Sequence, residues 1–193
     1  ASRRAVARGP HAFCEELRNG AHLFQGTADA TMTHGDPYEF IRLGLQLERA
    51  AKTVRIVTSR YPVAVALDED DPARARQLIA LLESCSAFEA FVKRHGTLFE
   101  PPAIAEHLIR SADFPRAVRS CLASSLDAVT RISSDQGAPH RILGRLVAGL
   151  EYGESQHTEL SVDAVCKAAV DRTGLDDFGP DDFRERLAVQ LAE

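Results

Sequence analysis

The sequence predicts an all-α protein, an antiparallel bundle of about six to eight helices, and three observations lead to this prediction. Apolar side chains recur at the helical period of about 3.6 residues along most of the chain. No segment alternates apolar and polar residues as a half-buried strand would. Hydrophobic residues make up 45% of the 193 positions, which is enough for a buried core.

The first predicted helix spans residues 11–32. Its apolar side chains recur at helical spacing and are Phe13, Leu17, Leu23, Phe24, Ala28 and Met32. His22 and Asp29 lie about two turns apart on one face of this helix. They either form a polar pocket with the next helix, or His22 is an ordinary core or surface histidine.

The central predicted helix spans residues 37–60, and the other elements are expected to pack around it. Asp36 can cap free amide groups, Pro37 suits the first helical position, and Glu39 completes a capping-box-like spacing. Two apolar stripes follow: Phe40, Leu43, Leu47, Ala50, Val54 and Val57, and then Ile41, Leu45 and Ile56. Two stripes predict packing on two sides, up to Tyr61-Pro62, where the regular pattern stops.

Polar residues lie between these stripes. They are Arg42, Gln46, Arg49 and Thr53 on one narrow strip, and Glu48 and Arg55 on another. One interpretation is an ordinary pair of Glu48 with Lys52, worth about 0.2 to 0.5 kcal/mol, with the arginines reaching solvent. The other is a buried ionic cluster around Glu48 and Arg49 that fixes helix register or binds an anionic ligand.

A helical hairpin and a short helix are predicted next. Residues 68–71 form an acidic loop, and Asp71-Pro72 starts a helix. Ser86 with Glu89 repeats the capping-box spacing for a second helix that ends at Gly96. Pro101-Pro102 begin a further short helix.

A second long helix is predicted to start at residues 113–115. Arg116 and Arg119 lie three residues apart near its amino end, where the helix dipole already favours anions. The two arginines either bind a phosphate or carboxylate, or form a salt bridge to Glu48 or to the acidic loop. One more helix of the bundle follows over residues 139–151, with Leu143 and Leu146 among its inward residues.

Both ends of the chain are expected to lie outside the bundle. Residues 1–10 form a flexible leader that closes with Gly9-Pro10. Residues 156–193 form a helical extension, with Ser161 capping one helix that ends at Gly174 and Pro180 opening the last.

Composition and motifs argue against several classes of protein. A net charge of −5 gives no electrostatic reason to bind nucleic acid, and no apolar run is long enough to cross a bilayer, so a cytoplasmic setting is expected. The four widely spaced cysteines, Cys14, Cys85, Cys121 and Cys166, are expected to be buried free thiols, so neither a metal nor a cofactor is predicted. No standard catalytic motif occurs, which leaves open whether the protein is an enzyme.

Three ordered blocks of the sequence resemble the bacterial alpha-E family. They are AHLFQGTADATMTHGDPYEFIRLGLQLERAAKTVRIV at residues 21–57, with the Glu48-Arg49 pair, DFPRAVRSCL at residues 113–122 and GRLVAGLEYG at residues 144–153. The resemblance covers residues 11–155 and implies the second half of a duplicated domain. Leu45 replaces a frequent arginine, and Tyr38 a frequent tryptophan. The stretch TGLDDFG, residues 173–179, is similar to the opening of some sulfotransferase-like proteins.

The resemblance implies a helical protein-interaction module with no defined biochemical activity, accessory to an ATP-grasp-type peptide synthesis or modification system. The expected partners are a second copy, another helical chain or an ATP-grasp-type ligase, since a half domain would expose apolar surface. The alternative is a ligand-binding or catalytic bundle with a charged pocket between helices. The candidate ligand-binding residues are His22, Asp29, Arg42, Glu48, Arg49, Arg116 and Arg119.

Overall fold

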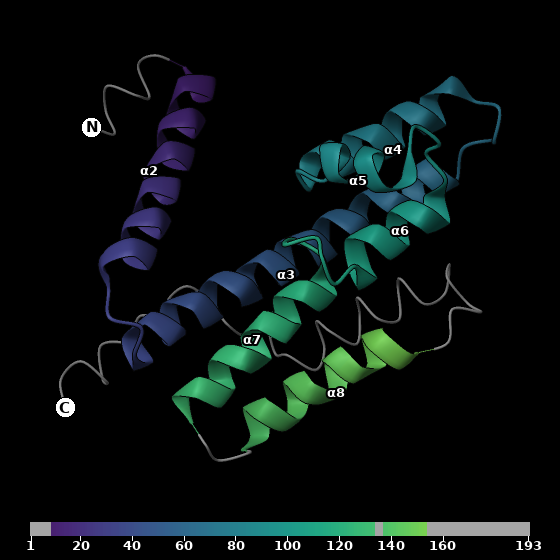
Figure 1. The fold of residues 1–193 in the computed structure, drawn as a ribbon. Helices are drawn as coiled ribbons and strands as arrows, with labels where there is room; N and C mark the ends of the chain where they lie inside the picture. The colour runs from purple at the N-terminus through teal and green to yellow at the C-terminus, as the bar shows by residue number, and fades with distance from the viewer. Residues whose placement is uncertain (1–8, 134–136, 154–193) are drawn as a thin grey trace.

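The computed structural model describes residues 9–133 and 137–153, and every regular element among them is a helix. These elements are α2 (Pro10–Thr31), α3 (Asp36–Val65), α4 (Pro72–Ser84), α5 (Phe88–His95), α6 (Pro101–Arg110), α7 (Val118–Ile132) and α8 (Ala138–Tyr152) (Figure 1). The all-α prediction is therefore confirmed. None of these helices is long and apolar enough to cross a bilayer.

The central helix is longer at its carboxyl end than the sequence pattern indicates. Gly35 is the N-cap without a side-chain hydrogen bond, so Asp36 is the first helical residue rather than the cap. Pro62 lies inside the helix, which continues to Val65. A proline inside a helix removes a hydrogen bond, but Tyr61 and Ala64 are buried in the core, and this packing outweighs the loss. The prediction that the helix stops at Tyr61-Pro62 is wrong.

The core forms around the carboxyl half of α3. Its first stripe is buried from Ala50 through Val54 and Val57, in one cluster with apolar residues of α4, α5, α6, α7 and α8. Leu47 and Ile56 pack against this cluster, so packing on two sides is found there. Phe40 and Ile41, at the amino end, are exposed. The central position of α3 is confirmed, although one side of its first turns faces solvent.

Two helix starts were predicted from capping side chains, Asp71 for α4 and Ser86 for α5. The Asp71 Oδ1 atom accepts a hydrogen bond from the Ala73 amide at 2.7 Å, as a capping aspartate does at the start of α4. At α5 the N-cap is Ala87, and Ser86 has a positive φ of 53°, so the predicted Ser86 cap is wrong. Gly96 ends α5 with a φ of 78°, a left-handed conformation that favours glycine.

The helix α7 begins at Val118, after a loop, and not at residues 113–115. In that loop the Phe114 amide donates to the Ser111 hydroxyl at 3.2 Å, and Phe114 is buried. Arg116 therefore lies just before the helix, and Arg119 lies in its first turn. The last described helix, α8, matches the predicted residues 139–151 to within one residue at each end.

The first helix, α2, stands apart from the bundle (Figure 1). Its bounds match the predicted residues 11–32 closely, but none of its residues is buried. It joins the rest through the turn at residues 32–35 and through two side-chain hydrogen bonds to α3. The predicted leader up to residue 8 and the predicted extension, residues 156–193, lie outside the described residues.

Candidate functional site

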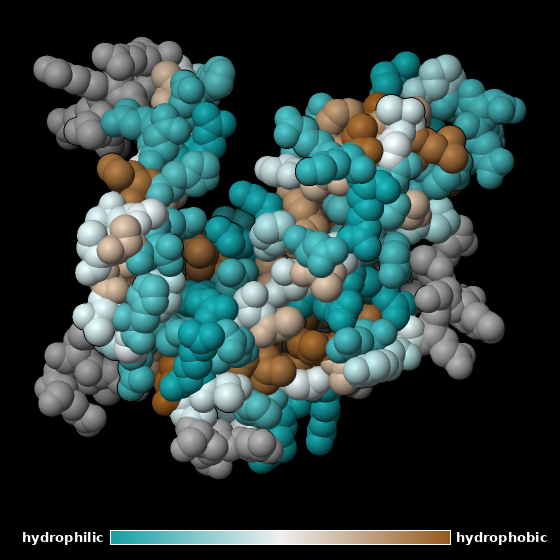
Figure 2. Space-filling model, viewed as in Figure 1, coloured by the Kyte–Doolittle hydropathy of each residue, from teal (hydrophilic) through white to brown (hydrophobic). Residues whose placement is uncertain are grey.

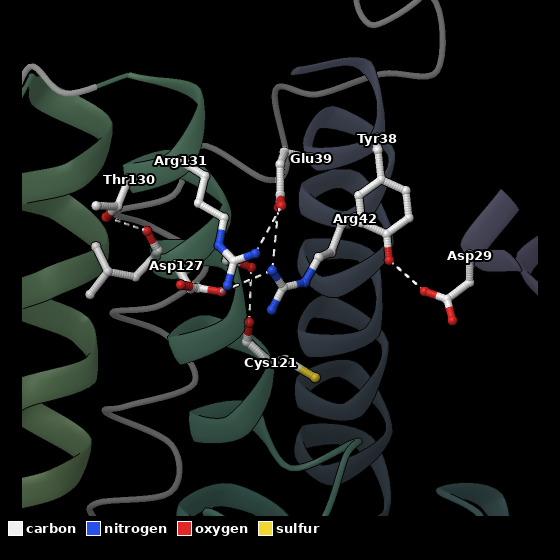
Figure 3. Close-up of polar contacts among 10 residues, drawn as sticks. Asp29, Tyr38, Glu39, Arg42, Cys121, Asp127, Thr130 and Arg131 are labelled. Atoms are coloured by element: carbon white, nitrogen blue, oxygen red, sulfur yellow. Dashed lines mark hydrogen bonds and ion pairs between the residues drawn. The ribbon is translucent and has the colours of Figure 1, made fainter. Parts of the chain in front are cut away.

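Four charged side chains of α3 and α7 form an ion-pair cluster (Figure 3). Since the two helices are antiparallel, the first turn of α3 lies beside the last turns of α7. The Arg42 Nη1 atom is 2.8 Å from Asp127 Oδ2 and 3.3 Å from Glu39 Oε2. The Arg131 guanidinium is 3.4 Å from Glu39 Oε1 and 3.3 Å from Asp127 Oδ2. Each carboxylate thus contacts both arginines.

Burial within this cluster is uneven. The Glu39 side chain is 4% exposed, whereas that of Arg131 is 57% exposed. A buried carboxylate without partners is very unfavourable, so the two guanidinium groups supply the partners that the Glu39 side chain needs there. Burial lowers the pKa of Arg42, but the hydrogen bond to Asp127 and the charges of Asp127 and Glu39 raise it above the ordinary value. The cluster therefore links α3 to α7 with its charges balanced.

The polar strip predicted on α3 continues this contact toward the other end of α7. Thr53 is buried, and its Oγ1 donates to the Arg116 carbonyl at 2.9 Å, just before α7 begins. Between Arg42 and Thr53, the Gln46 Oε1 atom is buried with no hydrogen-bond partner. Arg42 and Thr53 of this strip therefore lie on the side of α3 that faces α7.

The Glu48-Arg49 dipeptide does not form a buried ionic cluster, and that interpretation is wrong. The Glu48 side chain is 61% exposed, and its Oε1 is 2.7 Å from Lys52 Nζ, which is the ordinary i,i+4 pair. Arg49 is half-buried, and its Nη2 donates to Gln25 Oε1 of α2 at 3.3 Å. Glu48 is two residues from buried Ala50, so the helical period turns it away from the core.

The buried carboxylate of the central helix is Glu39, which the sequence pattern indicated only as a capping residue. The sequence does contain two spacings that allow an ion pair within one helix. They are Glu39 to Arg42 at i,i+3 and Asp127 to Arg131 at i,i+4. Such spacings are frequent on exposed helix faces, so they did not predict a buried site. The contact between the two pairs depends on the antiparallel packing of α3 on α7.

Arg116 and Arg119, which the sequence predicted to act together, do not share a partner. Arg119 Nη2 is 2.7 Å from Glu151 Oε1 of α8, so its partner is neither Glu48 nor the acidic loop. The Arg116 side chain is exposed and has no carboxylate partner among the described residues. The predicted shared salt bridge is therefore wrong, and each arginine lies in a different environment.

The two candidate residues of α2 also lie apart. Asp29 Oδ1 accepts a hydrogen bond from the Tyr38 hydroxyl at 2.6 Å, which raises the pKa of Tyr38. The ring of His34 stacks on that of Tyr38 at a centroid distance of 4.0 Å. His22 is exposed on α2. The seven candidate residues thus lie on α2, on α3, in the loop before α7 and on α7, and ligand binding by them stays a prediction.

A buried histidine that the sequence pattern missed lies in an aromatic cluster. His107 is 3% exposed, and neither ring nitrogen has a hydrogen-bond partner. Its ring stacks on Phe114 at 5.0 Å and meets Phe91 and His95 edge-on at 5.5 Å. Burial, with the nearby charges of His95 and Arg94, lowers the pKa of His107 to about 4. The residue is therefore neutral at pH 7 and enclosed.

The described cysteines are all unpaired, but they are not all buried. Cys85 and Cys121 are buried, and burial raises the pKa of each thiol to about 11. Cys14 is exposed on α2, so its predicted burial is wrong, and Cys166 lies outside the described residues. In the described part of the chain, no group of three or more histidine, cysteine or acidic residues is placed to hold a metal ion.

The comparison with protein families agrees with the helical fold and the Glu-Arg pair. Residues 1–189 match the alpha-E family, described as a predicted alpha-helical domain with a conserved ER motif. The chain has two Glu-Arg dipeptides, Glu48-Arg49 on α3 and Glu185-Arg186 outside the described residues. No curated protein and no solved structure matches the chain. Since the family match covers nearly all 193 residues, the chain belongs to the alpha-E family.

Proposed function

We propose that this chain is a helical protein-interaction module, accessory to an ATP-grasp-type peptide synthesis or modification system. The observation that supports it is the apolar surface of α2. Leu17 and Phe24, which lie on one face of α2, are 58% and 60% exposed, and the helix buries no residue. The proposed role of α2 is to bind another protein through these side chains.

The energetics of an isolated helix support this role. A helix in water is only marginally stable without tertiary packing. In α2, Gly20 and Gly26 each lower the stability of the helix by about 1 kcal/mol relative to alanine. Figure 2 shows the arm formed by α2 separated by a notch from the lobe that carries α4 and α5. A partner that covers the apolar side chains would stabilise the helix and remove hydrophobic surface from water.

The arrangement of charged groups favours an interaction module over an enzyme. Arg42 and Arg119 are neutralised by carboxylates within the bundle, and Glu48 pairs with Lys52. The residue with the strongly lowered pKa, His107, is enclosed by aromatic rings. A catalytic acid or base has to reach its substrate, and His107 is too enclosed for that role.

A cytoplasmic setting is part of the proposal. The buried thiols of Cys85 and Cys121 are unpaired, as is usual for proteins of a reducing compartment. The ATP-grasp-type ligase is proposed as a partner from the family resemblance.

The test uses the purified ATP-grasp-type ligase of the same cell and the whole chain as bait. Leu17→Asp with Phe24→Asp should weaken capture at least tenfold, because two charges would have to be buried in an apolar interface. The matched control, Asn19→Asp with Ala30→Asp, places two carboxylates on another face of α2 and should bind like the unmodified chain. Equal capture by all three proteins, each with unchanged circular dichroism, would refute the role of α2.

A second candidate function is the binding of an anionic ligand beside the Glu-Arg dipeptide. Arg49 and Arg116 have no carboxylate partner among the described residues, and the charges of both lower the pKa of the same thiol, Cys121, against the effect of burial. Calorimetry with inorganic phosphate and with citrate tests this. Arg49→Gln with Arg116→Gln should abolish the heat of binding, whereas Arg55→Gln on the exposed face should not. A titration without heat for the unmodified chain would exclude the site.

A further inference from the structure

We infer that the arginines of the second candidate function bind carboxylates of the chain's own residues 176–182. This inference rests on that candidate function, since it names the anionic group that occupies the same surface. The arginines are Arg49, Arg60 and Arg116, called the arginine row. Residues 176–182, with the sequence DDFGPDD, are called the acidic segment and lie outside the described residues.

The arginine row follows one side of α3. Successive residues of an α-helix are rotated by about 100°, so positions 49, 53 and 60 fall within about 40° of one another. Thr53 Oγ1 donates to the Arg116 carbonyl at 2.9 Å, which places Arg116 against α3 between Arg49 and Arg60. With a rise of 1.5 Å per residue, Arg49 and Arg60 are about 16 Å apart along the helix axis.

The charges of the arginine row act on two buried thiols. Burial raises the pKa of Cys121 to about 11, against the charges of Arg49 and Arg116. It raises the pKa of Cys85 to about 11 as well, against the charges of Arg116 and Arg60. Arg116 therefore lies close to both thiols and joins the two ends of the row into one positive patch.

The arginine row is open to an anionic partner. None of its members has a carboxylate partner among the described residues, and Arg60 and Arg116 are exposed. Arg119, one turn into α7, instead pairs with Glu151 at 2.7 Å. The unpaired positive charge is thus concentrated in the row.

The acidic segment complements this row in charge and in length. It contains four aspartates, Asp176, Asp177, Asp181 and Asp182, and no basic residue occurs between Arg172 and Arg184. The two aspartate pairs are five residues apart, a span of at most about 18 Å. This span matches the length of the row, so one pair can reach each end.

The chain leads from the bundle to the arginine row. Arg110 Nη2 donates to the Gly153 carbonyl at 2.6 Å, and Arg119 Nη1 donates to the Arg110 carbonyl at 3.5 Å. Gly153 therefore lies at the end of α7 where Arg116 lies. The chain from Gly153 to Asp176 can span at most about 80 Å, which is ample. Exposed ion pairs are individually weak, but the covalent connection raises the local concentration of the segment to the millimolar range.

Carbodiimide cross-linking of the full chain tests the contact, because it joins an amine only to a carboxylate that touches it. Arg116→Lys keeps the positive charge and supplies the amine. Position 116 should become linked to the acidic segment, and the product should keep the mass of one chain. Arg55→Lys, on the opposite side of α3, is the matched control and should give at least tenfold less of this link by peptide mapping. Equal yields at positions 55 and 116, or a product with the mass of two chains, would overturn the inference.

Calorimetry with inorganic phosphate separates this inference from the candidate function. If the acidic segment occupies the row for about nine-tenths of the time, replacing its four aspartates with asparagine should tighten phosphate binding about tenfold. The matched control also removes four carboxylates, by Glu154→Gln, Glu159→Gln, Asp163→Asn and Asp171→Asn, and should bind like the unmodified chain.

The two failures can be told apart. Phosphate binding that is the same in all three proteins would overturn the acidic segment as the occupant and leave the anion site in place. No heat from any of them, with the link at position 116 still formed, would exclude the binding of small anions and support the acidic segment as the partner of the row.

Discussion

The Oε1 atom of Glu39, in the first turn of α3, accepts a hydrogen bond at 3.4 Å from Nη1 of Arg131, which follows 92 residues later in the last turn of α7. This bond, with the pairing of Arg42 and Asp127, joins the amino-terminal end of α3 to α7. Further along the seam, buried apolar residues hold the two helices together. The ionic cluster thus holds α7 to the end of α3 that the core does not reach.

Replacing Glu39 with alanine should destabilise the fold by about 3 kcal/mol, the lower end of the range for removing one member of a buried ion pair, because Arg131 is more than half exposed. The loss follows from leaving two guanidinium groups without their buried partner. Urea unfolding measures it. Glu48→Ala is the control, and it should cost less than about 0.5 kcal/mol, since the pair with Lys52 is exposed. Equal losses for the two variants would contradict the assignment.

Replacing Thr53 with valine should cost about 1 to 2 kcal/mol, because the Arg116 carbonyl loses its donor while the site stays buried. The shape of the side chain is kept, so the change measures the hydrogen bond. Thr58→Val is the matched control, since the Thr58 hydroxyl bonds only to carbonyls of its own helix. Thermal unfolding of both variants compares them, and a Thr53 variant as stable as the control would show that the bond contributes little.

The sequence predicted the helices better than the charged site. Amphipathic periodicity and the Asp71 cap placed most helix boundaries within two residues, because these signals are local. The continuation of α3 past Pro62 depends on the burial of Tyr61 and Ala64, which local signals do not report. The burial of Glu39 likewise depends on a helix far away in sequence. Where tertiary packing decides the outcome, residue spacing alone could not predict it.

The three described cysteines should differ sharply in reactivity. Cys14 is exposed and should react with iodoacetamide in the folded protein within minutes at pH 8. Cys85 and Cys121 are buried with pKa values raised to about 11, so they should react only after unfolding. Peptide mapping by mass spectrometry reads each site separately. Labelling of Cys121 as fast as that of Cys14 would show that the seam between α3 and α7 opens readily.

Stability should fall between about pH 6.5 and pH 4 because of His107. Burial lowers the pKa of His107 in the folded state to about 4, while the unfolded chain titrates near 6.5. The unfolded state therefore binds a proton that the folded state excludes, so stability is fully present above pH 6.5 and is lost as the pH falls toward 4. The charges of His95 and Arg94 lower the pKa of His107 further, so they act in the same direction.

The loss attributable to His107 is on the order of 2 to 3 kcal/mol across this range. His107→Phe keeps an aromatic ring against Phe91 and Phe114 and removes the titrating group. Urea unfolding at pH 7 and at pH 4.5 should show a smaller loss for this variant than for the unmodified chain. His22→Asn, at an exposed position on α2, should keep the full loss of stability, because His107 is still present. The carboxylates titrate in the variants and in the unmodified chain alike, so their contribution cancels in the comparison. A pH dependence unchanged by His107→Phe would mean that the ring is protonated in the folded state as readily as in the unfolded chain.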